Sequence, residues 1–270
     1  MSERVDVGGR RARWFPTLSA RTPRNGAIVL AVVAAYWLSW HFAEVDPGRL
    51  IDGLPRLWSW VIRAWPPDFS DSGTLLARAA ETLAMATLGT TLGGALAIPV
   101  CFLAATNTTP NRLIYGVARV SLNALRGIDS FVFALLFVAA VGLGPFAGVL
   151  GIGVHSAGSI AKLWSEAVET AAAGPIEAAM LTGASKTKVL VFALLPDVLP
   201  SLVSTLLYVW EFNVRASTVL GIVGAGGIGQ ELKNNIDLLA FPRVFAILLV
   251  ILAMVTVIDR ASAWMRSRSS

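Results

Sequence analysis

The chain has 270 residues, of which 55% are hydrophobic and 14% are charged, with a mean hydropathy of +0.67 and a formal net charge of +5. In soluble domains about a quarter of the residues are usually charged, so this composition indicates a membrane protein. A single cysteine, Cys101, excludes an intrachain disulfide, and two distant histidines provide no zinc motif. We therefore expect no metal site, and we expect no nucleic-acid binding because there is no folded basic domain.

Arginines gather at both ends of the chain. Under the positive-inside rule, such flanks indicate that both termini are cytoplasmic. We expect a basic cytoplasmic tail over residues 1–25 and a short one over 265–270. A cleaved signal peptide is not favoured, because no small-residue cleavage site follows Trp40-His41-Phe42. The flanking arginines are Arg4, Arg10, Arg11, Arg13, Arg21 and Arg24, then Arg260, Arg266 and Arg268.

Apolar runs of sufficient length recur along the chain, since a helix needs about 20 residues to cross ~30 Å of hydrocarbon. They predict an all-α membrane protein with about six transmembrane helices. Residues 44–74 are expected to form an extracytoplasmic loop with a possible interfacial helix, because Trp58, Trp60 and Trp65 suit the membrane–water interface. The expected spans are 26–42, 75–104, 112–141, 146–163, 198–223 and 244–258.

A polar insert, residues 164–195, separates the fourth and fifth spans. Its apolar residues recur at near-helical spacing, which predicts a helix there. Gly183 lies mid-segment, and Pro196 and Pro200 are expected to end this segment and begin the next span. Two short helices at a membrane exit would suit the docking of another protein, whereas a solvated loop helix is the simpler alternative.

Several polar residues lie inside expected spans, where ionised groups are costly and usually functional. Glu211 and Arg215 are four residues apart and can pair on one helix face, or Arg215 can face an anionic substrate. Arg126 and Asp129 can form a local salt bridge or helix cap. The candidate residues of a translocation path are Arg126, Asp129, His155, Ser156, Glu211, Asn213, Arg215 and Ser217.

The run from Gly224 to Gly229 matches the letters GxGxxG, with glycines at Gly224, Gly226, Gly227 and Gly229. A dinucleotide site would need a preceding strand, whereas this run follows an apolar span, so we expect an outer glycine-rich loop. Gly183 and Lys186 do not form a phosphate-binding loop, because GxxxxGK[ST] is absent. The chain therefore has no ATP site of its own, and an ATPase partner or an ion gradient would supply energy.

The insert resembles the EAA loop of permease subunits in bacterial ABC importers. The matching residues are Glu177, Ala178, Ala179, Gly183, Leu195 and Pro196, whereas Ala193 departs from the pattern. The blocks ALLFVAAVGLGPFAGVL (134–150), FNVRASTVL (212–220) and GIVGAGGIG (221–229) are similar to permeases of phosphonate importers. Asp129 departs from the proline usual in that family.

The resemblance implies a type I importer permease fold with an extra first helix over 26–43, a core permease domain over 75–264 and a cytoplasmic coupling loop at about 164–196. It implies a homodimer in the bilayer of a bacterial cell membrane, two ATP-binding cassette subunits that hold ATP and Mg²⁺, and an extracytoplasmic solute-binding protein. Lys186 joins the residues above as a coupling candidate. The chain itself would have no catalytic residue and no cofactor.

The implied substrate is phosphonate or a related phosphorus oxyanion, such as phosphate or phosphite. Permeases of methionine or other amino acids share the general plan and remain an alternative. An ion-driven secondary transporter is less favoured, because no inverted repeat with broken helices is visible. An intramembrane enzyme lacks a Ser/His or His/carboxylate set at helical spacing.

Overall fold

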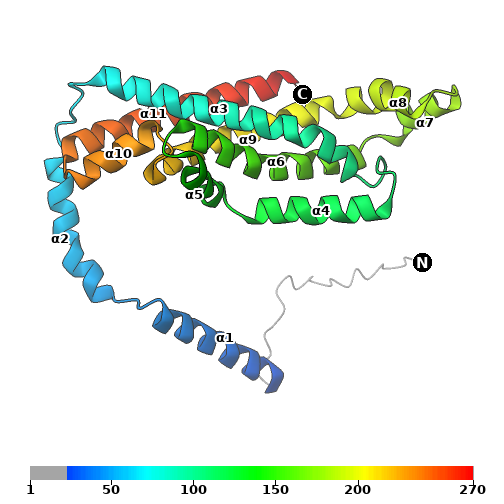
Figure 1. Cartoon of the computed structure of the whole chain (residues 1–270). Helices are drawn as coiled ribbons and strands as arrows, with labels where there is room; N and C mark the ends of the chain where they lie inside the picture. The colour runs from blue at the N-terminus through cyan, green and yellow to red at the C-terminus, as the bar shows by residue number, and fades with distance from the viewer. Residues whose placement is uncertain (1–22, 270) are drawn as a thin grey trace, which may run out of the picture. The chain divides into compact units, whose positions relative to one another are not determined.

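The computed structural model describes residues 23–269, and every regular element in that range is a helix (Figure 1). Most of the predicted basic N-terminal tail, residues 1–22, lies outside the described residues. The helices are α1 (Pro23–Phe42), α2 (Pro47–Arg63), α3 (Ser72–Leu103), α4 (Arg112–Gly127), α5 (Ser130–Val141), α6 (Pro145–Glu169), α7 (Ala173–Leu181), α8 (Lys186–Val189), α9 (Leu195–Leu220), α10 (Gly227–Asp237) and α11 (Phe241–Ser269). A π-helical turn, Leu190–Leu194, and a 3₁₀ turn, Gly221–Val223, flank α9.

The chain divides between Trp58 and Ser59 into two compact units. The first contains α1, a 20-residue helix whose described side chains are all exposed. Its exposed residues are mainly apolar, including Leu30, Tyr36 and Trp37. An apolar helix with exposed side chains suits a lipid environment, since lipid rather than a packed core would then cover its surface.

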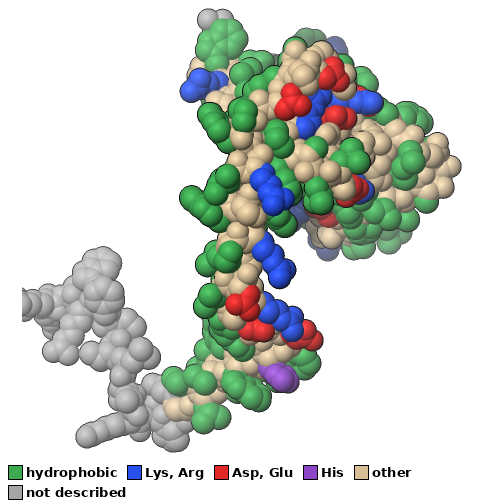
Figure 2. All heavy atoms as spheres, turned by 90° about the vertical axis from the view of Figure 1, so that its left-hand side faces the viewer, with side chains coloured by type: hydrophobic (Ala, Val, Ile, Leu, Met, Phe, Trp, Pro, Cys, Tyr) green, Lys and Arg blue, Asp and Glu red, His purple; other side chains and the backbone are tan. Residues whose placement is uncertain are grey.

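The helix α2 is strongly amphipathic. Arg49, Arg56 and Arg63 recur every seven residues, about two helical turns, and therefore share one face. Figure 2 shows basic side chains along one edge of α2 and hydrophobic side chains along the other. The segment predicted as a loop with a possible interfacial helix thus contains 17 helical residues. The apolar face consists of Leu50, Ile51, Leu54, Leu57, Trp58, Val61 and Ile62, all exposed.

In the part of the chain that the structure describes, four helices are long and apolar enough to cross a membrane, namely Ser72–Leu103, Pro145–Glu169, Lys186–Val223 and Phe241–Ser267. Two bent pairs raise this number to as many as six, in agreement with the predicted count of about six. One pair consists of α1 and α2, bent by 50°, and the other of α4 and α5, bent by 85°. The span expected over 112–141 thus consists of two helices, because the chain leaves the helix at Ile128 and Asp129 caps a new one by accepting from the N–H of Phe131.

The central packing contact is between α3 and α6. A Cβ on Gly89 would lie 2.6 Å from Cγ2 of Ile152, and one on Gly93 would lie 2.7 Å from Cβ of Ser156. These two glycines, one helical turn apart, therefore let the helices approach closely. The largest buried cluster lies nearby and joins α3, α4, α6 and α9, with Trp164 donating from its indole to the carbonyl of Leu202 at 3.0 Å.

The segment before α3 packs against the start of α11. The rings of Trp60 and Phe241 stack with their centroids 5.6 Å apart. Asp71 caps α3 by accepting from the N–H of Thr74, and hydrogen bonds from Thr74 lower the pKa of the Asp71 carboxyl. Arg243 donates to the carbonyl of Asp71 at 3.1 Å. These contacts fix where α3 begins within the second unit.

The fifth span is longer than predicted. A helical run of 38 residues, Lys186–Val223, passes without interruption through Pro196 and Pro200. Pro196 has no N–H to donate, and the π-helical turn Leu190–Leu194, which ends two residues before it, accommodates the missing hydrogen bond. The prediction that Pro196 ends one segment and begins another is therefore wrong. Residues 164–169 also belong to α6. The segment that links α6 to the helical run Lys186–Val223 is therefore only about 170–185, shorter than the predicted coupling loop of 164–196.

Candidate functional site

The segment between the two long helices carries an exposed short helix, α7. It has no buried residue, and Figure 1 shows it with α8 at one end of the bundle. Glu177 and Ala178 are exposed and Ala179 is half-buried. The apolar side chains of Met180 and Leu181 are 58% and 89% exposed. A short helix that presents apolar side chains outside the core has the form of a docking surface.

A turn at Gly183 separates α7 from α8. Its backbone φ is +75°, a conformation that favours glycine, and its N–H donates to the carbonyl of Met180 at 3.0 Å. A Cβ at this position would meet no atom within 4 Å, so backbone conformation rather than space calls for glycine. Lys186 follows as the exposed first residue of α8.

Two contacts tie α7 to the helices behind it. The N–H of Ala172, just before α7, donates to Oδ2 of Asp197 in α9 at 3.0 Å. Ile176, on the inner side of α7, packs with Leu195 against the large buried cluster. These contacts join α7 to the first turn of α9.

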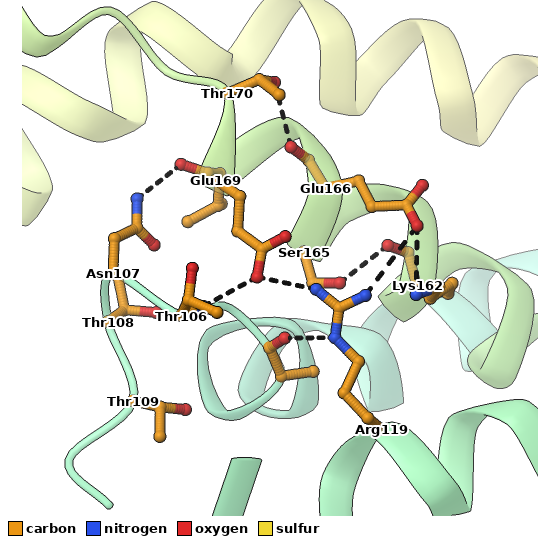
Figure 3. Close-up of polar contacts among 12 residues, drawn as sticks. Thr106, Asn107, Thr108, Thr109, Arg119, Lys162, Ser165, Glu166, Glu169 and Thr170 are labelled. Atoms are coloured by element: carbon orange, nitrogen blue, oxygen red, sulfur yellow. Dashed lines mark hydrogen bonds and ion pairs between the residues drawn. The ribbon is translucent and has the colours of Figure 1, made fainter. Parts of the chain in front are cut away.

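A polar cluster secures the end of α6 just before α7 (Figure 3). Arg119 of α4 donates to Oε1 of Glu169 at 2.7 Å and to the carbonyl of Ala104, after α3, at 2.8 Å. The N–H of Thr106 donates to the same Glu169 oxygen at 2.8 Å. Glu166 lies 3.9 Å from the Arg119 guanidinium and 3.1 Å from Lys162. The cluster thus joins α3, α4 and α6 at one point.

Three predicted path residues line one cavity of about 230 Å³. Arg126 comes from the last turn of α4, His155 from α6 and Asn213 from α9, beside Tyr208 and Phe212. His155 is held by a 2.8 Å hydrogen bond between Nδ1 and the carbonyl of Ile128, at the break between α4 and α5. Since a carbonyl only accepts, Nδ1 carries the proton of this bond.

Two further predicted residues line a second cavity, of about 360 Å³. Asp129 contributes from the cap of α5 and Arg215 from α9, and Phe212 borders this cavity as well as the first. Of the two local roles predicted for Arg126 and Asp129, a salt bridge or a helix cap, the structure shows the cap. Asp129 caps α5, and among residues 23–269 no salt bridge joins it to Arg126. Arg126 and Asp129 instead face different cavities.

Ser156 and Ser217 lie in the packed interior. Both are fully buried, and Ser217 donates to the carbonyl of Val214 within its own helix. Ser156 accepts a 2.8 Å hydrogen bond from Nδ2 of Asn213, which also donates to Oγ1 of Thr90. These side chains therefore join α3, α6 and α9 inside the bundle, and neither serine lines the two cavities described above.

Arg215 belongs to a ladder of charges between α9 and α11. It pairs with Glu211, as their spacing predicted, and lies 3.3 Å from Asp259. Glu211 also accepts from Arg266 at 3.0 Å. Alternating charges compensate one another in this ladder, which lowers the cost of holding them between helices.

The glycine-rich run is packed rather than open, and the prediction of a loop is wrong for Gly227 and Gly229, which belong to the first turn of α10. Gly224, Gly226 and Gly227 have positive φ values, and the N–H of Ile228 donates to Oγ1 of Thr82 at 2.8 Å. A Cβ on Gly229 would lie 1.8 Å from the carbonyl oxygen of Thr218, so only glycine fits. A helix precedes this loop, which agrees with the prediction that it is not a dinucleotide site. Within the described residues, no His, Cys, Asp and Glu group could hold a metal ion.

Comparison with known proteins assigns the family. The model of the binding-protein-dependent transport system inner membrane component matches residues 97–270. The chain belongs to this family. It is a permease subunit of an ABC transporter and, like the family, a component of the inner membrane.

Curated relatives of this permease cover nearly its whole length. It is 49% identical to the putative phosphite transport system permease protein HtxC of Stutzerimonas stutzeri, over 92% of this chain and 88% of that one. It is 44% identical to the phosphite transport system permease protein PtxC of the same species, over 89% and 86%. The phosphate-import permease protein PhnE of Mycolicibacterium smegmatis is 40% identical over 92% of this chain and 46% of its own length.

Solved structures support the fold of the permease. An inward-facing conformation of the MetNI methionine ABC transporter matches with a TM-score of 0.64 and 25% identity, over 73% of this chain and 96% of that one. An amino acid ABC transporter crystallised with histidines matches with a TM-score of 0.60 at 17% identity. The all-helical type I importer permease fold predicted from the sequence is thus confirmed.

The predicted site residues of the permease all lie inside the family match, whereas α1 and α2 lie outside it. Sequence reasoning missed the partners that these residues meet. Asp259 and Tyr208 carry no local motif, and only their contacts identify them. The sequence shows Arg119 as a charge in an apolar stretch. Its partner, Glu169, is 50 residues away, so only the folded structure identifies the pair.

Proposed function

We propose that this permease forms the path through which an ABC importer moves a phosphorus oxyanion, such as phosphite, phosphonate or phosphate. The observation that carries this proposal is the 49% identity, over 92% of the chain, to a putative phosphite permease. Arginines at both cavities agree with an anionic cargo, because a guanidinium can donate two hydrogen bonds at once to phosphate-like oxygens.

The working assembly contains two copies of this chain, two ATP-binding cassette subunits and an extracytoplasmic solute-binding protein. The family and the relatives support the ATPase and binding-protein partners, and the homodimer is our inference. We place both termini and α7 on the cytoplasmic side, following the charges that flank the apolar spans. ATP and Mg²⁺ belong to the cassette subunits.

In this proposal α7 docks on the ATPase through its exposed face, which carries Glu177, Met180 and Leu181. Closure of the ATPases on ATP moves α7. The Ala172–Asp197 contact and the continuous helix Lys186–Val223 pass that movement to Phe212 and Arg215 at the cavities. Hydrolysis of ATP then resets the permease.

The test is uptake by the complete importer in proteoliposomes with ATP inside. We expect ATP-dependent uptake of phosphite, phosphate or methylphosphonate, and none of methionine or sulfate. Omission of the ATPase subunits should abolish uptake. Uptake that continues without them would favour an ion-driven carrier, and uptake of methionine alone would assign the permease to the other substrate class.

A further inference from the structure

The cavity between the end of α4, α6 and α9 contains one charged side chain without a partner. Arg126 makes no hydrogen bond or ion pair with any residue of the described chain, although it lines a cavity of about 230 Å³. Its backbone lies close to α6: a Cβ added to Gly158 would be 3.1 Å from the backbone nitrogen of Arg126. A guanidinium with five N–H donors and no counter-charge attracts an anion into this cavity.

Asn213 lines the same cavity and carries an unsatisfied acceptor. The residue is fully buried, and its Oδ1 has no hydrogen-bond partner. The contacts of its neighbour fix which amide atom points where. Thr90 donates its only hydroxyl proton to the carbonyl of Ala86 at 2.7 Å, so it can only accept from Asn213. Nδ2 therefore faces Thr90 and Ser156, and Oδ1 is the atom left over.

An unpaired buried acceptor costs free energy that a bound donor would recover. Oδ1 has less than 1 Å² of accessible surface, and Asn213 borders the cavity, so the cavity is the side from which a donor can approach this atom. The site thus combines a positive donor, Arg126, with an acceptor, Asn213. His155 adds a second acceptor when neutral, because Nδ1 carries the proton that binds Ile128 and Nε2 is then free to accept.

We propose that this cavity is a subsite for a singly protonated phosphorus oxyanion, in which Arg126 binds the P–O⁻ oxygens and Oδ1 of Asn213 accepts from the P–OH group. A fully deprotonated anion has no proton for Asn213, which leaves that acceptor unpaired. Such a site rejects analogues that lack the hydroxyl proton, because a buried polar group would stay unsatisfied. This inference rests on the proposed transport of phosphorus oxyanions.

The test compares two anions that differ in that one hydrogen. Methylphosphonate as its monoanion and methanesulfonate share charge and shape, and only the first has an acidic hydroxyl. Equilibrium binding is measured on the purified permease–ATPase complex in nanodiscs, without the solute-binding protein. We expect methylphosphonate to bind at least about tenfold more tightly than methanesulfonate, the effect of one hydrogen bond of ~1.4 kcal/mol.

Two variants separate the two contacts. Arg126→Gln should weaken the binding of both anions about tenfold or more, whereas Arg112→Gln, at the other end of the same helix, should leave both unchanged. Asn213→Thr should keep methanesulfonate binding and remove the preference for methylphosphonate. If Asn213→Thr fails to assemble with the ATPase, the proposal is still tested by the affinities of the wild-type complex for the two anions and by the affinities of Arg126→Gln.

Equal affinities of the wild-type complex for the two anions, no detectable binding of either, or unchanged affinity in Arg126→Gln would each overturn the subsite. The uptake assay with the complete importer separates this result from the proposed function. Wild-type uptake of phosphite together with any of those three results would leave the function standing and the subsite rejected. Absence of phosphite, phosphate and phosphonate uptake would reject the function itself.

Discussion

Arg119 of α4 donates a 2.7 Å hydrogen bond to Glu169, the last residue of α6. Three residues separate Glu169 from α7, so this pair holds the helix end from which the exposed segment departs. The same guanidinium reaches the carbonyl of Ala104 beyond α3. The pair therefore connects the proposed ATPase-facing end to three helices of the core.

Removal of the Arg119 guanidinium should destabilise the permease. The Arg119 and Glu169 side chains are only 15% and 22% exposed, so Arg119→Gln should lower the free energy of unfolding by about 1–3 kcal/mol, less than for a fully buried pair because water reaches part of both. Thermal unfolding of the purified complex measures this as a lower midpoint.

A double-mutant cycle with Glu169→Gln checks that the effect belongs to the pair. The two substitutions should cost less together than the sum of their separate effects. Lys233→Gln is a matched control, because Lys233 pairs with Asp237 on the exposed surface. This substitution should lower the free energy of unfolding by less than about 1 kcal/mol. Additive effects of Arg119→Gln and Glu169→Gln would contradict the proposed link.

Substitution of Gly183 should uncouple ATP hydrolysis from transport. With φ at +75°, an alanine there would add about 1–2 kcal/mol of backbone strain, and a valine more, although no atom obstructs the side chain. We expect Gly183→Val to reduce uptake at least about tenfold while the protein still inserts in the membrane, and Gly183→Asn to retain most uptake, because asparagine tolerates positive φ.

Gly174 provides the control for this experiment. It lies in the first turn of α7, has equally open space around its Cβ position and is not among the glycines with positive φ. Gly174→Ala should therefore retain uptake where Gly183→Ala loses part of it. Normal uptake by Gly183→Val would refute the docking role of this turn.

Arg215 should matter for transport beyond its structural pairing. In Arg215→Gln, Glu211 keeps its contact with Arg266, so the ladder between α9 and α11 survives in part. We expect normal abundance and a reduction of oxyanion uptake by about tenfold, because the second cavity loses its positive charge. Unchanged uptake at normal abundance would leave Arg215 with the structural role alone.

The apolar face of α2 should lie in the membrane interface. In a Cys101→Ala background, spin labels at Leu54→Cys and Asp52→Cys report on opposite faces of this helix. The label at Leu54 should be the more accessible to dissolved oxygen and the label at Asp52 to a water-soluble nickel reagent, since amphipathic helices bury the apolar face about 5–10 Å into the headgroup boundary. Equal accessibility of both labels to the two reagents would exclude that orientation.

Local sequence patterns predicted much of this architecture. Long apolar runs are visible in a sequence because a helix surrounded by lipid must be apolar over most of its length, and this rule identified about six spans. Gly89 and Gly93 lie four residues apart, a spacing typical of close helix contacts in membranes, and α3 and α6 make such a contact there. The Glu211–Arg215 pair was also predictable, because both residues belong to one helix and lie four residues apart.

Other features depend on residues far apart in the sequence. The 85° break between α4 and α5 lies in an apolar stretch that hydropathy alone joins into one span. The run through Pro196 continues because a π-helical turn accommodates the proline, which no local propensity indicates.

The sequence by itself determined the membrane class, the spans and the segment that resembles an ATPase-docking loop, because each depends on neighbouring residues. Only the tertiary structure brought Arg126 of α4 to the same cavity as Asn213 of α9 and left the Asn213 oxygen without a partner. That arrangement depends on the close approach of α4 to Gly158 of α6, which is a matter of complementary shape between distant segments.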